Sequence, residues 1–191
     1  MFNSEEEFNS YYNNNYHEPW LSTVMSSDGA IINYNKSEYQ QLLETPLTFE
    51  ILSDGEIKWT AQNSSYTCTI EYKKNDGQWI SITSNTGTSA PSINVVSGDI
   101  VQFRGDNATY ASDSNKYNSF NGTTCQFNVN GNIMSLINST NFTNITTFTN
   151  NYTFCELFNN YTGLISAKNL ILPVTILSES CYFGMFFFVV H

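Results

Sequence analysis

The sequence predicts a mainly β protein, and three observations predict it. Between residues 46 and 130, apolar residues alternate with polar ones over short runs, as they do in half-buried strands. Residues that favour turns separate those runs. About a third of the chain is Asn, Ser or Thr, whereas Lys, Arg, Glu and Ala are scarce. Those scarce residues are the usual surface residues of helices, so we expect strands and turns.

Composition and charge exclude several classes of protein. The chain has 191 residues, a net charge of −10 and 15% aromatic residues, which is enough apolar material for a core. The excess of acidic residues argues against a surface for nucleic acid or anionic membranes, so we expect neither partner. No apolar run approaches the roughly 18 residues of a membrane helix, so we expect no membrane insertion.

Residues 1–45 form a polar, acidic and aromatic leader without sustained periodicity. Disordered tails are usually poor in aromatic residues, whereas this leader is rich in them. We expect it to dock on a partner surface through large side chains, and the alternative is a loose terminal tail. The predicted docking residues are Phe8, Tyr16, Trp20 and Tyr34.

Residues 46–130 are predicted to form a β-sandwich domain. Its six or seven short strands are typical of an immunoglobulin-like or fibronectin-like sandwich. The turn residues at 53–55 and 75–77 each contain Gly and are predicted to close hairpins. Residues 106–122 are rich in Asn and Ser and are expected to form a long exposed loop.

Residues 131–191 have a different character, and two segments within them align at an offset of 28 residues. Leu157 and Phe158 align with Met185 and Phe186, and Phe154 aligns with Tyr182. Repeating units that cannot bury their apolar side alone must stack on one another. The pattern predicts a short region of leucine-rich-repeat type, and the alternative is accidental similarity in a stretch of low complexity.

Residues 46–191 also resemble chains found in phages of gut Bacteroides and in their hosts, which join an immunoglobulin-type module to leucine-rich repeats of the BspA type. The leader resembles the start of structural proteins of crAss-like phages. The stretches that carry these resemblances are residues 46–55, 98–107, 131–137 and 169–173 for the modules, and residues 16–20 and 32–36 for the leader.

The resemblance implies a structural protein of a tailed phage particle, such as a head fibre or a capsid or tail attachment component. Its partners would be other virion proteins, and its location the virion, assembled in the host cytoplasm. The first residues carry no basic start or apolar stretch of a signal peptide, which agrees with release by lysis. The alternative is a bacterial surface adhesin module that binds a host glycan or protein.

The sequence offers no catalytic or metal-binding constellation. The two histidines are His17 and His191. A nucleophile within residues 46–130, which we name the β region, therefore lacks its usual base. No phosphate-binding glycine motif is present, and the four cysteines are not paired at the spacing of a zinc site. We therefore expect no enzymatic activity, no cofactor and no metal, and we expect the four cysteines to be buried thiols.

The last predicted feature is an apolar run near the C-terminus that has high β-propensity and no charge. An exposed run of this kind invites association. As a strand it would present apolar residues on both faces, so we expect it to be buried between chains, most simply in a homo-oligomer. The alternative is that the run packs on Leu157, Phe158, Leu170 and Leu172 of its own chain. The predicted interface residues are Met185, Phe186, Phe187, Phe188 and Val189.

Overall fold

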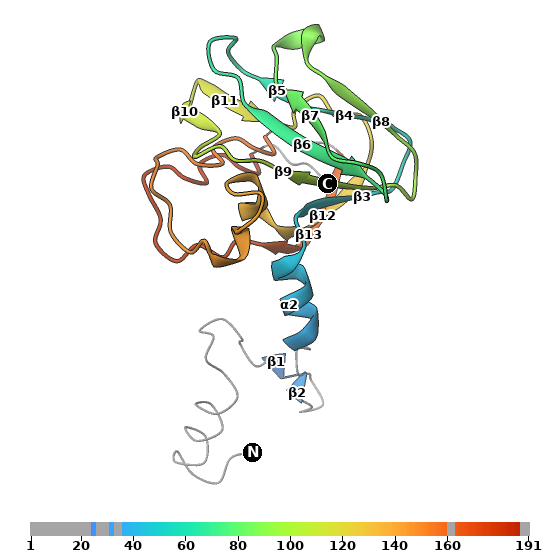
Figure 1. Cartoon of the computed structure of the whole chain (residues 1–191), viewed down its shortest axis with the longest axis vertical. Coiled ribbons are helices and arrows are strands. Elements are labelled where there is room, and N and C mark those ends of the chain that lie inside the picture. Colours follow the sequence, from blue (N-terminus) through green and yellow to red (C-terminus); the bar gives the residue numbers. More distant parts are fainter. Residues whose placement is uncertain (1–23, 26–30, 33–35, 160–162, 188–191) are drawn as a thin grey trace. The chain divides into compact units, whose positions relative to one another are not determined.

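The computed structural model describes residues 24–25, 31–32, 36–159 and 163–187. The chain divides into two compact units, residues 1–40 and residues 41–191. In the first unit, β1 (Val24–Met25) pairs antiparallel with β2 (Ile31–Ile32). The helix α2 (Lys36–Glu44) begins in the first unit and ends in the second (Figure 1). The docking residues predicted in the leader, Phe8, Tyr16, Trp20 and Tyr34, lie outside the described residues.

The sequence analysis did not predict α2, and its C-terminal end has clear local causes. Pro46 disfavours helical backbone at the residue before it, so the helix stops at Glu44. The Thr45 hydroxyl donates to the carbonyl of Gln41 (2.6 Å), which satisfies one of the last helical carbonyls. The side-chain amide of Asn132 donates to the carbonyl of Leu43 (3.1 Å), and this bond ties the helix end to the β structure.

The chain is mainly β, and its largest sheet has six strands in the order β13-β12-β3-β9-β6-β7. All neighbours in this sheet are antiparallel except β12 and β13, which are parallel. The strands are β3 (Leu47–Ile51), β6 (Thr69–Lys74), β7 (Ile80–Thr83), β9 (Ile100–Arg104), β12 (Phe127–Asn132) and β13 (Leu164–Ile171).

Two smaller sheets pack on the six-stranded sheet. One pairs β4 (Gly55–Lys58) with β8 (Ser92–Val95), and the other has the order β10-β11-β5. The remaining strands and short 3-10 helices are β5 (Thr60–Ala61), β10 (Ala111–Asp113), β11 (Lys116–Ser119), η1 (Gly87–Ser89), η2 (Ile133–Leu136) and η3 (Phe142–Asn144). Several sheets around one core are consistent with the predicted β-sandwich.

Of the two predicted hairpins, one is confirmed and one is wrong. Residues 75–77 join β6 to β7, and Tyr72 pairs with Ile80. Residues 53–55 do not close a hairpin, because β3 pairs with β9 and β12 whereas β4 pairs with β8. The chain crosses from one sheet to another at this point. The Asp54 carboxylate accepts a hydrogen bond from the Ser97 N–H (2.9 Å), so two sheet-to-sheet connections are tied together there.

The expectation of a long exposed loop over residues 106–122 is also wrong. This segment contains β10 and β11, and the side chains of Tyr110 and Phe120 are completely buried. The Tyr110 hydroxyl donates to the Leu136 carbonyl (2.6 Å) and accepts from the Asn107 amide (2.9 Å), so burial leaves this polar group satisfied. Aromatic burial outweighs the turn preference of the Asn and Ser residues around it.

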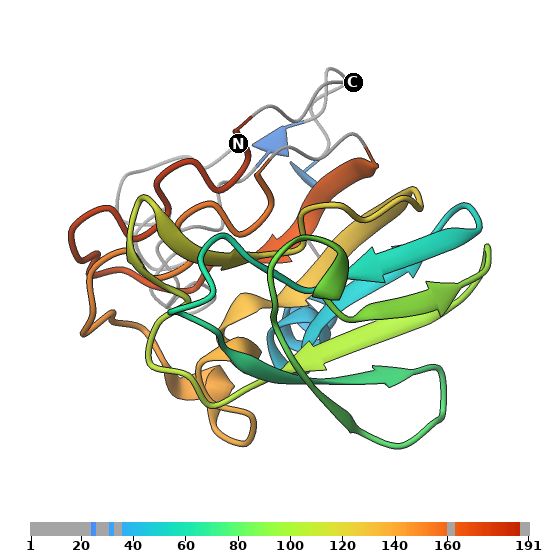
Figure 2. The same cartoon turned by 90° about the horizontal axis from the view of Figure 1, so that it is seen from above.

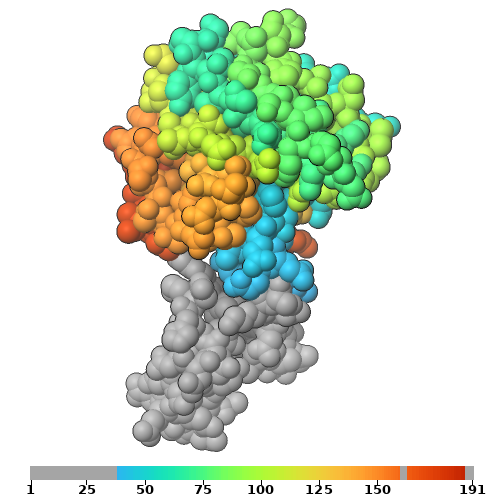
Figure 3. Space-filling model, in the orientation of Figure 1, coloured from blue at the N-terminus to red at the C-terminus, as the bar shows by residue number. Residues whose placement is uncertain are grey.

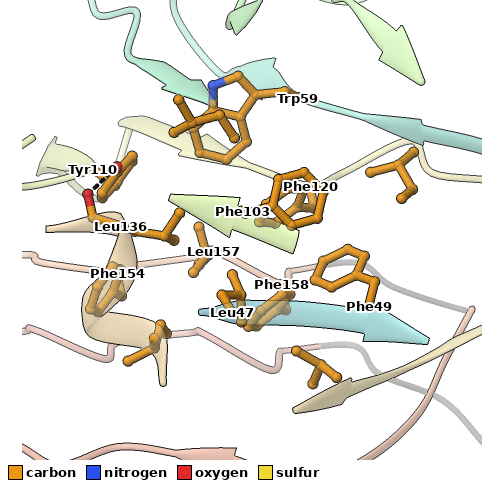
Figure 4. Close-up of a cluster of buried hydrophobic side chains, with 14 of the residues drawn as sticks. Leu47, Phe49, Trp59, Phe103, Tyr110, Phe120, Leu136, Phe154, Leu157 and Phe158 are labelled. Atoms are coloured by element: carbon orange, nitrogen blue, oxygen red, sulfur yellow. Dashed lines mark hydrogen bonds between the residues drawn. The ribbon is translucent and has the colours of Figure 1, made fainter. Parts of the chain in front are cut away.

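One hydrophobic core contains residues of both segments that the sequence predicts, residues 46–130 and residues 131–191. The boundary between them falls inside β12, and the buried cluster contains residues from both sides of it. Phe49 of β3 stacks on Phe127 (4.2 Å between ring centroids), and Phe49 also lies 6.1 Å from Phe158. Figure 4 shows Phe154, Leu157 and Phe158 beneath Phe103 and Phe120, within the same cluster as Trp59.

Candidate interaction surface

From β12 onward the chain forms two similar units, each consisting of a strand followed by an irregular coil. We name residues 146–159 the first coil and residues 174–187 the second coil, which follow β12 and β13. In Figures 1 and 2 the two coils, drawn in orange and red, run side by side. In the space-filling view the orange atoms lie against the yellow-green atoms of the β region (Figure 3). The first coil lies between the β region and the second coil.

The offset of 28 residues seen in the sequence is the offset at which the two coils pack. Phe154 stacks on Tyr182 (6.1 Å, 19°) and Phe158 stacks on Phe186 (5.5 Å, 11°). The same rings continue into the β region, where Tyr110 stacks on Phe154 (5.8 Å, 14°). Phe120 stacks on Phe158 at the same centroid separation (5.8 Å, 15°). Two columns of three rings therefore run from the β region through both coils.

The backbone repeats with the rings. In the first coil the N–H groups of Cys155 and Leu157 donate to the carbonyls three residues earlier, and those of Phe183 and Met185 do the same in the second coil. Positive φ angles recur at the same offset, at Tyr152 (58°) and Ser180 (55°) and at Glu156 (59°) and Gly184 (62°). Left-handed backbone is costly for residues other than Gly, so packing must hold these side chains in place.

Glu156 is the one buried carboxylate in the coils. It is 8% exposed, its Oε2 atom has no hydrogen-bond partner, and burial raises the pKa of this carboxyl. The carboxylate occupies the space above Gly184, its equivalent in the second coil. A Cβ atom on Gly184 would lie 2.7 Å from the Glu156 Cδ. A residue other than Gly at position 184 would therefore collide with this carboxylate.

The outer side of the second coil is an exposed apolar surface, which we name the open end. A cavity of about 420 Å³ opens there, lined by Tyr182, Gly184 and neighbouring apolar residues. Exposed apolar surface of this kind marks interaction sites. Three large apolar side chains that line the cavity are exposed, Leu172 (42%), Phe186 (40%) and Phe187 (56%), and three more in the second coil are exposed as well, Ile176 (64%), Leu177 (59%) and Phe183 (57%).

The predicted interface residues take different positions. Met185 is buried (3% exposed) and its carbonyl accepts from the Phe158 N–H (2.9 Å). Phe186 and Phe187 are exposed at the open end, and Phe188 and Val189 lie outside the described residues. Residues 185–187 form turns, so the expected strand with two apolar faces is wrong for this part of the run. Met185 packs in the core, whereas the Phe186 ring stacks on Phe158 with one side left exposed.

A second, polar hollow lies where β3, β12 and β13 are neighbours. It has a volume of about 150 Å³ and is lined by Glu50, Asn128, Asn130 and three polar residues of β13. The Glu50 carboxylate accepts from the side-chain amides of Asn130 (2.7 Å) and Asn128 (3.4 Å), which fixes its position. Lys168 of β13 is exposed at its rim. The sequence analysis missed this hollow, because only the parallel pairing of β12 with β13 brings the residues together.

The four cysteines are buried, as predicted, and none is paired with another. Burial raises the pKa of Cys68 and Cys125 to about 11, and that of Cys155, which also lies near Glu156 and Asp113, to about 12. Such thiols stay protonated at neutral pH and are poor nucleophiles.

Two further properties concern the part of the chain that the structure describes. Within residues 36–159 and 163–187, no group of three His, Cys, Asp or Glu residues is placed to hold a metal ion. None of the helices that the structure describes is long and apolar enough to cross a membrane.

Comparisons with models of known protein families, with curated proteins and with solved structures find no match to this chain.

Proposed function

We propose that the chain is a non-enzymatic structural protein of a tailed phage particle of the crAss-like type, which joins other particle proteins. The open end is the observation that carries this proposal. Six large apolar side chains in the second coil and next to it are 40% to 64% exposed, and a partner protein would bury them. A permanent component of an assembly can keep such a surface, whereas a free soluble chain tends to aggregate through it.

The resemblance adds a finer architecture to this proposal. We propose that residues 46–130 are an immunoglobulin-like module and that the two turns after it are repeats of leucine-rich type. The stacking of both coils at one offset supports the repeat assignment, since stacked units that bury one another's apolar sides define solenoids. The position would be a head fibre or a capsid or tail attachment site.

Two attachment regions follow from the proposal. The leader would dock on the capsid or tail through Phe8, Tyr16, Trp20 and Tyr34. Phe186 and Phe187, which are exposed, would be buried between chains together with Phe188 and Val189, whereas Met185 already packs in the chain's own core. The mature location would be the virion.

Mass spectrometry of purified virions tests the proposal. Virions are banded on a density gradient and washed, and the chain is quantified against the major capsid protein. A fixed ratio across the band, in several preparations, is the expected result. Absence of the chain from the band, or its removal by washing, would contradict a structural role. Replacement of Tyr16, Trp20 and Tyr34 by Ala should lower incorporation while residues 46–130 stay folded.

The polar hollow favours a second candidate function, an adhesin module that binds a glycan. A carboxylate held by two amides accepts hydrogen bonds from neighbouring sugar hydroxyls, and Lys168 can donate to them. NMR titration of the full chain with simple sugars tests this function, with Glu50→Gln as the variant and Glu56→Gln on β4 as the control. Shifts confined to the hollow that disappear only in Glu50→Gln would support it. No shift at millimolar sugar would exclude it.

A further inference from the structure

The β region, the first coil and the second coil form three successive layers. The backbone hydrogen bonds that join these layers beside the two ring columns all run in one direction. The N–H of Phe120, in the β region, donates to the carbonyl of Leu157 in the first coil (3.0 Å). The N–H groups of Tyr152, Glu156 and Phe158 in turn donate to carbonyls of the second coil, each over 2.9 Å. Beside the ring columns each layer therefore donates outward, whereas at the start of the coils the N–H groups of Thr175 and Ile176 donate inward to the Thr146 carbonyl (2.9 Å and 3.5 Å).

The same register predicts the chemistry of the outermost layer. At the offset of 28, the donors Tyr152, Glu156 and Phe158 correspond to Ser180, Gly184 and Phe186. Among the described residues, no group accepts a hydrogen bond from the N–H of any of these three. The open end therefore presents a row of three backbone donors and no matching row of acceptors.

The apolar features of the open end follow the same repeat. The rings of Tyr182 and Phe186 each stack on a ring of the first coil, and the cavity at the open end is lined partly by both. The second coil has a single charged side chain, Glu179, which accepts from the Asn151 amide beneath it (3.2 Å). Beside the second coil, β13 is an edge strand of the six-stranded sheet. The surface is thus continuous with an existing coil–coil interface and is predominantly apolar.

We propose that the open end binds an uncharged segment of another protein chain, which adds as a third coil. Three carbonyls of that segment accept from the N–H groups of Ser180, Gly184 and Phe186. Two of its apolar or aromatic side chains, four residues apart, pack on Tyr182 and Phe186. This mode resembles strand addition to a sheet, in which the backbone supplies affinity and side-chain pockets supply specificity. That the partner belongs to the particle rests on the proposed function, whereas the binding mode does not.

The direction of the hydrogen bonds also decides against a second copy of this chain as the occupant. Two open ends placed face to face would oppose donors to donors. Head-to-tail stacking is blocked as well, because Tyr110 and Phe120, the lowest rings of the columns, are completely buried in the β region. A segment of a different protein, free to offer carbonyls, meets neither obstacle.

The first coil supplies a probe for the experiment, because it already has the required pattern. A synthetic peptide with the sequence of residues 146–159, with Cys155→Ser to prevent oxidation and Glu156→Gln to remove its charge, offers the carbonyls and the Phe pair of a coil. It is titrated into the isotope-labelled full chain, and amide shifts and hydrogen exchange are read by NMR. We expect the amides of Ser180, Gly184 and Phe186 to shift and to gain protection. A peptide of the same composition in scrambled order should leave them unchanged.

Two Phe variants provide a matched pair. Phe186→Ala removes a column ring and should weaken peptide binding by about tenfold, the size expected for one stacked aromatic contact. Phe183→Ala removes a ring that is more exposed than Phe186 (57% against 40%) and stands outside both columns, and it should change binding by less than about twofold. Equal effects of the two variants would overturn the proposed register.

Two other results would overturn the proposal. One is no shift of the three amides at millimolar peptide. The other is protection of the same amides in the free chain together with a doubled mass in light scattering, which would make a second copy the occupant. Neither result depends on whether the chain is found in virions, so failure of this inference and failure of the proposed function are distinguishable.

Discussion

Phe158→Ala tests whether the β region and the coils share one core. Phe158 is completely buried, and its ring stacks between Phe120 (5.8 Å) and Phe186 (5.5 Å). Truncation of a buried Phe to Ala costs about 3–5 kcal/mol through lost transfer free energy and a residual cavity. Two stacked contacts of about 0.5–1.5 kcal/mol each place the expected loss in the upper half of that range. Small domains have about 5–15 kcal/mol of stability, so the variant should fold but be weakened.

Urea unfolding followed residue by residue with NMR is the assay. Peaks of β9 and of the first coil should lose intensity at the same urea concentration, and that midpoint should fall for both in Phe158→Ala. Phe183→Ala is the control, since this ring is 57% exposed and its loss should cost less than about 0.5 kcal/mol. A loss below about 1 kcal/mol for Phe158→Ala, or early unfolding of the coil with an unchanged β9 midpoint, would refute a shared core.

Three further substitutions have expected effects on stability. Gly184→Ala should destabilise by more than the roughly 1–2 kcal/mol of left-handed strain, because its Cβ meets the buried Glu156 carboxylate; chemical denaturation measures this. Glu156→Gln should be stabilising at pH 7, with the difference lost as pH falls below about 4, because a raised folded-state pKa means that ionisation costs stability. Asp99→Asn should destabilise by about 1–3 kcal/mol at pH 7, since this carboxylate accepts from the Val96 N–H and the Asn75 amide. Those bonds lower the pKa of Asp99, so its contribution should be present above about pH 4 and lost as pH falls through the folded-state value.

Each of these has a control or a contrary outcome. Gly87 has a similar φ (57°) but no atom within 4 Å of an added Cβ, so Gly87→Ala reports strain alone. Equal costs for the two Gly variants would mean that Glu156 moves aside freely. A pH-independent effect of Glu156→Gln would show that its charge is not the destabilising feature. An Asp99→Asn penalty that persists at pH 2 would contradict the carboxylate as the acceptor.

The strands could be predicted from the sequence because their signal is local. Leu47, Phe49 and Ile51 alternate with polar residues and form β3, and the Asn and Gly at 75–77 close a real hairpin. Strand pairing across the sheets is not local, so the sequence does not show that β3 lies between β9 and β12. The burial within residues 106–122 has no clear local signal, because two buried aromatic residues, Tyr110 and Phe120, outweigh many turn-forming neighbours.

The repeat of the two coils could also be predicted only in part from the sequence. The offset of 28 could be read from Phe154 and Phe158, whose equivalents are Tyr182 and Phe186. The direction of the hydrogen bonds between the coils could not be predicted, because it depends on positive φ angles at Tyr152, Phe154 and Glu156. These residue types carry no sequence signal for left-handed backbone, which is usually marked by Gly or Asn. The open end could therefore be predicted as an apolar run but not as a row of donors.

Amide hydrogen exchange of the free chain tests the central claim most directly, namely that the second coil presents an open row of backbone donors at Ser180, Gly184 and Phe186. The amides of Tyr152, Glu156 and Phe158, bonded to the second coil, should be protected by roughly a hundredfold or more, since each tenfold equals about 1.4 kcal/mol of opening free energy. The amides of Ser180, Gly184 and Phe186 should exchange at nearly the rate of an unstructured peptide. Equal protection of the two sets in a monomeric chain would contradict the claim.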